Sequence, residues 1–267
     1  MTTPKVDTIK RSGSRFYVHP ETAEKVPGVT SIVGMLPKPF LTRWAAKSTA
    51  EYAVEHAGTI VQLAMTDPDG AIALLKGAPW RDTGKAADTG TAVHDLYERL
   101  GNGETVKRVQ PELEPYLSHF HEFVAEFSPK FLFQEETVWS DTHRYAGSFD
   151  ALVEVNGSRL WIDWKTTRSG VYPEVALQLA AYAHADHILR PDGTKVPLPK
   201  ATEAAVFHVR PEGWSLVPAR IDEEVFSYFL HLREVFEWDS YVNGSVLGKS
   251  LNARPTVNKQ GQRRASF

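Results

Sequence analysis

The stretch Gly147–Tyr182 reads GSFDALVEVNGSRLWIDWKTTRSGVYPEVALQLAAY. Two runs within it, Phe149–Val155 and Ser158–Thr166, are rich in β-branched and aromatic residues and are separated by the pair Asn156-Gly157. That pair is the one most favoured in a two-residue hairpin turn, because both positions accept positive φ. We therefore expect two paired antiparallel strands.

Three charged side chains should meet at one end of this hairpin. Asp150 lies near the start of the first strand, opposite the end of the second, where Asp163 and Lys165 share a face. Two carboxylates that lie close together repel unless positive charge lies between them. Mg²⁺ or Mn²⁺ suits carboxylate oxygens, and a lysine beside them can orient an attacking water or offset charge on a phosphate. The cluster predicts metal-assisted phosphodiester hydrolysis.

The same residues carry a resemblance to a known family. Asp150 followed by Asp163-Trp164-Lys165 and then by Gln178-Leu-Ala-Ala-Tyr182 is similar to the signature of the PD-(D/E)XK nuclease superfamily, closest to its RecB-like, phage-type exonuclease branch. Gly90-Thr-Ala-Val-His94 resembles the upstream histidine motif of that branch. The match covers roughly residues 85 to 210, and its order and spacing make it distinctive.

The resemblance implies a role for each matched residue. The metal, Mg²⁺ or Mn²⁺, would be held by His94, Asp150, Asp163 and the carbonyl of Trp164. Imidazole would favour Mn²⁺ more than an all-oxygen site does. The catalytic set would be Asp150, Asp163, Lys165 and Gln178, in which Lys165 readies the water and Gln178 steadies it. Glu136 could reach the metal from a neighbouring strand, although sheet-edge charge is its simpler interpretation.

Candidate DNA contacts lie on both sides of this set. Phage-type members of the branch carry a pattern similar to Val-Thr-Ser, Lys-Pro and Trp-Ala-Ala-Lys in the N-terminal part of this chain. The candidate contacts are Thr30, Ser31, Lys38, Lys47, Arg168 and Tyr182. Each has another interpretation: helix capping for the two hydroxyls, solvation for the three cations and core packing for Tyr182.

Composition limits the class of protein. The 267 residues are 42% hydrophobic and include no cysteine, so disulfides, thiolate metal sites and the iron–sulfur cluster of some RecB-like relatives are excluded. The net charge is −3, but residues 1–49 contain eight basic and three acidic residues, and residues 249–267 contain five basic residues and no acid. Basic ends around an acidic centre fit an enzyme that grips phosphates at its flanks.

The expected fold is α/β: a restriction-endonuclease-like core, with a central mixed β-sheet flanked by helices, and a mainly helical N-terminal region. The expected domains are an N-terminal hairpin and helical region that contacts DNA ends (1–82), the nuclease core (83–243) and a basic flexible tail (244–267). Expected core elements are helices over 83–100, 112–127, 173–189 and 222–241 and strands over 131–139, 145–155, 158–166, 203–210 and 214–218. Gly90 is costly inside a helix, so we expect a close approach of another backbone or of substrate there.

The resemblance implies a metal-dependent DNA exonuclease that hydrolyses phosphodiester bonds from DNA ends, in phage-type recombination, repair or replication. Its partner would be DNA with linear or single-stranded ends, and any recombination partner protein is unidentified. A non-catalytic nucleic-acid-binding protein on a nuclease scaffold and a structure-specific endonuclease stay open. No apolar run is long enough to span a bilayer and the N-terminus lacks a signal-peptide core, so we expect no membrane partner and a cytoplasmic protein, in the host cell of a phage.

Overall fold

The computed structural model describes residues 4–81, 83–249 and 251, without the side chains of 83–86. The expected tail, 244–267, lies mostly outside these residues. Within them the strands form three sheets, ordered β1-β2-β3, β10-β9-β5-β6 and β12-β11-β8-β7-β4. The strands are β1 (Thr8–Arg11), β2 (Ser14–Val18), β3 (Lys25–Pro27), β4 (Lys130–Gln134), β5 (Thr137–Ser140), β6 (Tyr145–Ser148), β7 (Ala151–Val155), β8 (Ser158–Lys165), β9 (His187–Leu189), β10 (Lys195–Pro197), β11 (Glu203–Arg210) and β12 (Gly213–Ala219).

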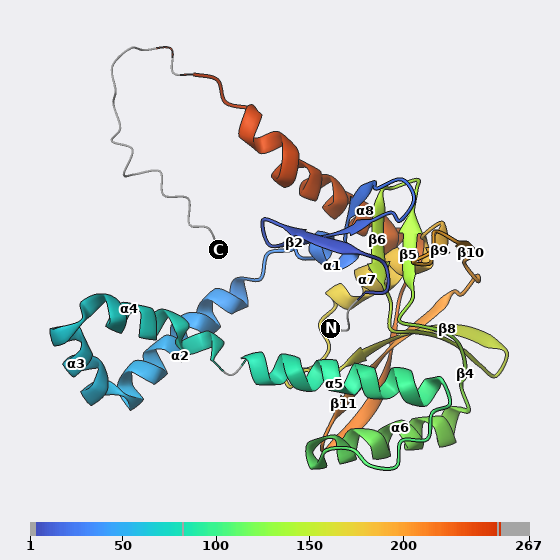
Figure 1. Cartoon of the computed structure of the whole chain (residues 1–267), viewed down its shortest axis with the longest axis horizontal. Helices are drawn as coiled ribbons and strands as arrows, with labels where there is room; N and C mark the ends of the chain where they lie inside the picture. Colours follow the sequence, from blue (N-terminus) through green and yellow to red (C-terminus); the bar gives the residue numbers. More distant parts are fainter. Residues whose placement is uncertain (1–3, 82, 250, 252–267) are drawn as a thin grey trace.

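Helices cover both faces of the five-stranded sheet, and three more form a separate arm. They are α1 (Val29–Val33), α2 (Pro39–Glu55), α3 (Ala57–Thr66), α4 (Pro68–Gly77), α5 (Thr83–Gly101), α6 (Glu114–Phe127), α7 (Glu174–Ala183) and α8 (Glu223–Glu237), with short helical turns at Ala78–Trp80, Pro111–Leu113, Trp238–Val242 and Asn243–Ser245. Figure 1 shows α5 and α6 below the sheet and α1, α7 and α8 above it. The expected α/β class is confirmed at this level: a mixed sheet flanked by helices.

The β7–β8 hairpin forms as predicted from its turn. Asn156 and Gly157 have φ of 50° and 85°, and Ala151 pairs with Ile162 across the two antiparallel strands. On its other side β8 runs parallel to β11, with Val206 beside Asp163, which makes the sheet mixed. The central strands are therefore paired along both edges.

Alternation along β8 divides the core into two layers. Trp164 faces α5 and α6, among Tyr97, Phe123 and Phe207. Trp161 faces the other way, into a cluster with α1, α7 and α8. Because side chains of a strand alternate between faces, Asp163 takes the Trp161 side, under α7.

Two of the expected strands are wrong in extent because the chain changes sheets within them. The run 131–139 splits into β4 and β5 at Glu135, where φ is +48°, and the run 145–155 splits into β6 and β7 around Asp150. The two segments stay paired across the break, since the N–H of Glu135 donates to the carbonyl of Asp150 at 3.0 Å. The two sheets thus diverge at Glu135 and Asp150.

The expected helix over 173–189 is also too long. Helix α7 ends at Ala183, and His187–Leu189 forms β9, which pairs with β5. The two histidines of this segment are not on the surface. His187 is 7% exposed, and the His184 ring is half-buried and stacks on Phe226 with centroids 4.5 Å apart. Pairing with an existing strand outweighs the helical periodicity of this short segment.

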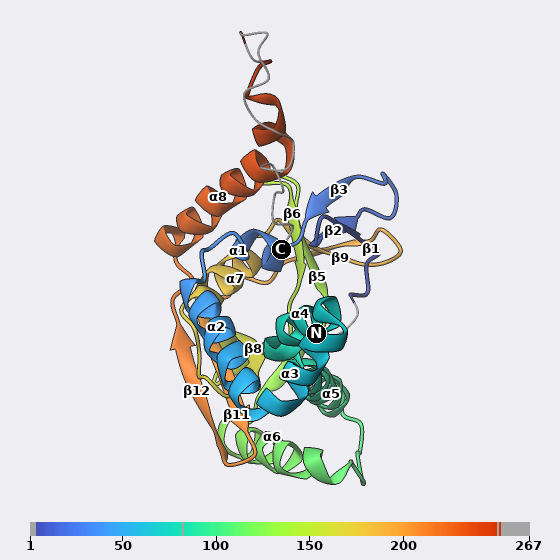
Figure 2. The ribbon, with the colours of Figure 1, turned by 90° about the vertical axis from the view of Figure 1, so that its left-hand side faces the viewer.

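Helices α2, α3 and α4 form an arm that stands apart from the sheets (Figure 1). No residue of α2 or α3, both fully described, is buried, and α4 buries only Ala71. Figure 2 shows the arm in front of α5 and β8. None of the helices in the described part of the chain is both long and apolar enough to cross a membrane.

Candidate active site

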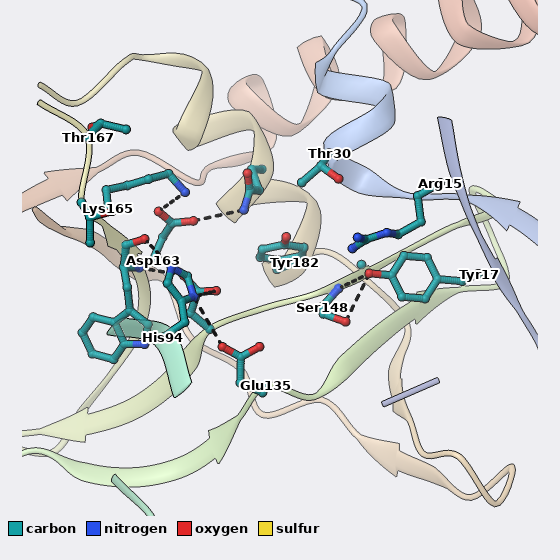
Figure 3. Close-up of a pocket in the computed structure, with 15 residues that line it drawn as sticks. Arg15, Tyr17, Thr30, His94, Glu135, Ser148, Asp163, Lys165, Thr167 and Tyr182 are labelled. Atoms are coloured by element: carbon teal, nitrogen blue, oxygen red, sulfur yellow. Dashed lines mark hydrogen bonds and ion pairs between the residues drawn. The ribbon is translucent and has the colours of Figure 1, made fainter. Parts of the chain in front are cut away.

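The hairpin and α7 together position an acid–lysine–glutamine set. Asp163 is 1% exposed, and its Oδ2 lies 2.6 Å from Nζ of Lys165, two residues along the same strand face. Its other oxygen, Oδ1, accepts a hydrogen bond of 3.0 Å from Nε2 of Gln178 on α7. Both oxygens of the buried carboxylate are thereby oriented, as Figure 3 shows.

Asp150 lies in the bend where β6 gives way to β7. Its Oδ2 accepts a 2.7 Å hydrogen bond from the backbone N–H of Trp164, which ties the bend to the end of β8. Its Oδ1 lies 3.3 Å from Nδ1 of His94. The predicted convergence of Asp150 with the β8 residues is therefore produced by a backbone hydrogen bond as well as by strand pairing.

His94 projects from α5 into this cluster. Its Nε2 lies 3.0 Å from the carbonyl oxygen of Trp164, a pairing in which Nε2–H donates. Its Nδ1 lies 3.3 Å from Asp150 and 3.6 Å from Oε1 of Glu135. The sequence interpretation made the Trp164 carbonyl a metal ligand, but in this structure that oxygen orients the imidazole.

Glu135 is the residue that sequence reasoning missed. It is 6% exposed and adopts the left-handed conformation at the break between β4 and β5, which turns its carboxylate toward His94. Its neighbour Glu136, considered instead from the sequence, pairs with Lys5 at 3.3 Å. Nothing in a Glu-Glu pair tells which member points inward, because the backbone break decides it.

The charges in the cluster depend on one another. Burial disfavours the imidazolium of His94, but the carboxylates of Asp150 and Glu135 outweigh it and raise its pKa to about 10. Burial likewise opposes the Asp150 carboxylate, yet His94 lowers its pKa overall. Without a metal ion the protonated imidazole supplies the positive charge that the two carboxylates require, and a cation bound at Nδ1 would replace that proton.

The second ion pair has the opposite balance. Burial, together with the nearby charge of Asp150, raises the pKa of Asp163 to about 6, although Lys165 acts to lower it. For Lys165, burial works against the charged amine, but Asp163 and Asp150 outweigh it and raise its pKa. At neutral pH both groups are charged and face one cavity.

The residues fit a divalent cation. One ligand atom each from His94, Glu135 and Asp150 lies within 4.8 Å of the others, all three residues being half-buried or buried. Carboxylate oxygens with one imidazole form a donor set suited to Mg²⁺ or Mn²⁺. These atoms line a cavity of about 260 Å³ that Asp163, Lys165 and Gln178 also line.

Gly90 and Gly147 keep backbones close to this cavity. A side chain at Gly90 on α5 would meet Oγ1 of Thr166 at 3.3 Å, so the near neighbour within the chain is a side chain and not the expected backbone. At Gly147 it would meet the Tyr182 ring at 2.6 Å and Val29 at 2.9 Å. Glycine at these positions lets α5 and β6 approach the cavity wall.

The predicted DNA contacts divide into those near the cavity and those away from it. Thr30 and Tyr182 line it, although Tyr182 is 2% exposed and packs near Phe149. Ser31 is not among the lining residues, because its hydroxyl accepts from the N–H of Arg15 at 2.9 Å. Arg15, not predicted as a contact, lines the cavity itself (Figure 3).

The remaining three predicted contacts lie farther out. Lys38 lines a second cavity next to the first. Lys47 is on the arm and pairs with Glu51 at 3.5 Å. Arg168 is exposed on the loop after β8 and lines neither cavity.

Comparison with known proteins assigns this chain to no family. No family model matches the chain, and no curated protein matches it. Among solved structures, one described as "Crystal structure of SSO0001" is 12% identical, with a TM-score of 0.31, over 80% of this chain and 98% of that one. A likeness this distant supports no inference, so function is argued from the site geometry alone.

Proposed function

We propose that the chain is a metal-dependent deoxyribonuclease of the PD-(D/E)XK superfamily, with a restriction-endonuclease-like core, that acts as an exonuclease on DNA ends. The observation that supports this most is the convergence of polar side chains from separate elements on one cavity. These side chains are His94, Glu135, Asp150, Asp163, Lys165 and Gln178. Apart from Glu135, their order along the chain is the one that the superfamily resemblance implies.

We propose that His94, Glu135 and Asp150 hold the metal ion, because their ligand atoms converge. When bound, Mg²⁺ or Mn²⁺ would polarise the phosphate and lower the pKa of a water molecule. Asp163 is held 2.6 Å from Lys165 and lines the same cavity. It is the acid best placed to receive a proton from, or to orient, an attacking water.

Lys165 and Gln178 have separate tasks in this proposal. The ammonium of Lys165, charged at neutral pH, offsets negative charge that develops on the phosphate. The amide of Gln178 donates to Asp163 and so fixes the orientation of the carboxylate. Arg15 and Thr30, on the opposite wall, are placed to contact phosphates of the bound strand.

The experiment that tests the proposal compares end-labelled linear DNA with closed circular DNA, each with Mg²⁺ or Mn²⁺. We expect short products from the linear DNA only, and loss of product formation in Asp163→Ala. Lys165→Ala should lower the rate by about 10²- to 10³-fold, the cost of removing one group that stabilises transition-state charge.

A histidine pair gives the matched control. His94→Ala should abolish hydrolysis, whereas His121→Ala, an exposed histidine on α6, should leave it unchanged. Cleavage of the closed circle would replace the exonuclease by the endonuclease alternative. Absence of hydrolysis with both metals and both DNA forms would reject the nuclease proposal.

A further inference from the structure

A second cavity of about 360 Å³ adjoins the first. The two share Thr30, Lys165, Thr167 and Gln178 as lining residues, so they meet at the residues that contact Asp163. The second cavity continues away from the metal ligands toward the start of α2. A substrate that reaches Lys165 can therefore extend into it.

An aromatic pair lies at the outer part of this cavity. Tyr172, from the loop between β8 and α7, lines the cavity and stacks on Phe40, the second residue of α2. Their ring centroids are 5.5 Å apart and their planes differ by 11°. Phe40 is 42% exposed and Tyr172 36% exposed, so both rings leave surface open to a ligand.

A cation lies beside the aromatic pair. Lys38 lines the same cavity, with Nζ 3.5 Å from Oε1 of Glu174 at the start of α7. A partly exposed ion pair of this kind contributes little to stability. A phosphate can therefore replace Glu174 as the partner of Lys38 at a small cost in free energy. Figure 2 shows that α2 starts beside α7.

We propose that the second cavity is a subsite for one nucleotide of a single-stranded DNA end, whose base stacks on the open face of Tyr172, with Phe40 packed behind that ring, and whose phosphate contacts Lys38. The inference rests on the proposed function, because it places this nucleotide next to the phosphate held between Lys165 and the metal ligands. It assigns the substrate as a strand with unpaired bases at the site.

Base stacking and cavity size both favour a single strand. A base can stack on protein rings only when its face is free, and in a duplex both faces are covered by neighbouring bases. The cavity volume is near the lower end of the ~300–1,000 Å³ range of pockets that hold one small ligand. One nucleotide fits such a space, whereas two paired strands do not.

Fluorescence of 2-aminopurine tests the subsite without requiring hydrolysis. Single strands carrying 2-aminopurine at successive positions from one end are titrated with the full-length protein, with Ca²⁺ as the only divalent ion. We expect strong quenching at one position, lost in Tyr172→Ala and in Phe40→Ala. Affinity should fall about 5-fold or more in these variants, in line with the known strength of base–aromatic stacking.

Controls separate stacking from structure. Tyr172→Phe keeps the ring and should keep the quenching, and Tyr228→Ala, an exposed tyrosine on α8, should change nothing. In the wild-type protein an abasic nucleotide at the quenched position should weaken binding as much as Tyr172→Ala does, with no further loss when the two changes are combined. A blunt duplex of the same sequence should show no quenching.

The outcomes distinguish this inference from the proposed function. Hydrolysis without any position-dependent quenching or abasic effect would overturn the subsite and leave the nuclease standing. Position-dependent quenching in a protein that hydrolyses no DNA would support the subsite and overturn the nuclease. Equal quenching of single strand and blunt duplex would overturn the single-strand assignment.

Discussion

The β7–β8 hairpin, which lines the first cavity, and the α2–α4 arm, which begins beside the second, are built in opposite ways. The hairpin is paired with strands on both sides and covered on both faces, and Asp163 and Trp164 within it are each 1% exposed. Helices α2 and α3 bury no residue. The difference indicates that packing fixes the chemical groups, while the arm can adjust its position at low energetic cost.

Replacing one tryptophan in each region tests this comparison most directly. Trp164→Ala should lower the free energy of unfolding by about 3–5 kcal/mol, because it removes a buried side chain from a close-packed cluster. Trp44→Ala on α2, where the ring is 38% exposed and meets Trp80 edge-on, should cost less than about 1.5 kcal/mol. Urea unfolding followed by circular dichroism measures both, and equal losses would break the comparison.

Two neighbouring glutamates test a similar contrast, between a buried and a half-buried position, at the proposed metal site. Glu135→Gln should weaken Mn²⁺ binding by about 10- to 100-fold, because its carboxylate lies in the cluster with His94 and Asp150. Glu136→Gln should have little effect, since that side chain pairs with Lys5. Isothermal titration with Mn²⁺ decides, and the reverse ranking would remove Glu135 from the proposed metal site.

The pH profile is the next largest effect. Burial raises the pKa of Asp163 to about 6, so the carboxylate forms only as the pH rises through that value. If the reaction needs the ionised acid, kcat/KM should fall about tenfold per pH unit below about 6.

The folded state also holds this proton more tightly than the unfolded chain, so the contribution of Asp163 to the free energy of unfolding decreases as the pH rises toward about 6.

The measurement is kcat/KM at saturating Mn²⁺ between about pH 5 and about pH 8. Glu51→Gln on the arm should leave the profile in place, because Glu51 pairs only with Lys47 among the ion pairs of the described residues. A profile that is flat through about pH 6 would show that ionisation of Asp163 does not limit the reaction.

The smallest expected effect is the difference between replacing Lys38, which precedes the arm, and replacing Lys47, which lies on it. Lys38→Ala should weaken DNA binding a few-fold and reduce the slope of log affinity against log salt by about 1, as expected for one lost phosphate contact. Lys47→Ala should change neither the affinity nor the salt dependence. Its side chain is 74% exposed and lines neither of the two cavities. A larger effect for Lys47 would extend the DNA path along the arm.

Local patterns predicted the parts of the site that lie on one continuous element. The Asn156-Gly157 turn and strand alternation were enough to place Asp163 and Lys165 on one face, and helical spacing placed Gln178 on the helix that follows. The helix expected over 222–241 is likewise capped at its start, where the side chain of Asp222 accepts from the N–H of Val225.

Residues at breaks in the elements could not be placed in this way. The strand pattern runs through Glu135 and Asp150 without interruption, although both lie where the chain passes from one sheet to another. The Phe40–Tyr172 stack joins residues that are far apart in the sequence and belong to different regions. No periodicity within either segment indicates such a contact.

The sequence by itself determined the hairpin, its charged face and the order of the acids, lysine and glutamine, because turn chemistry and alternation act over a few residues. Only the tertiary structure decided that Glu135, and not Glu136, joins His94 and Asp150, and that a second cavity opens beside Lys165. These features depend on how two diverging sheets, α1, α5 and α7 pack together. Such packing is a property of contacts between distant segments, which no local pattern encodes.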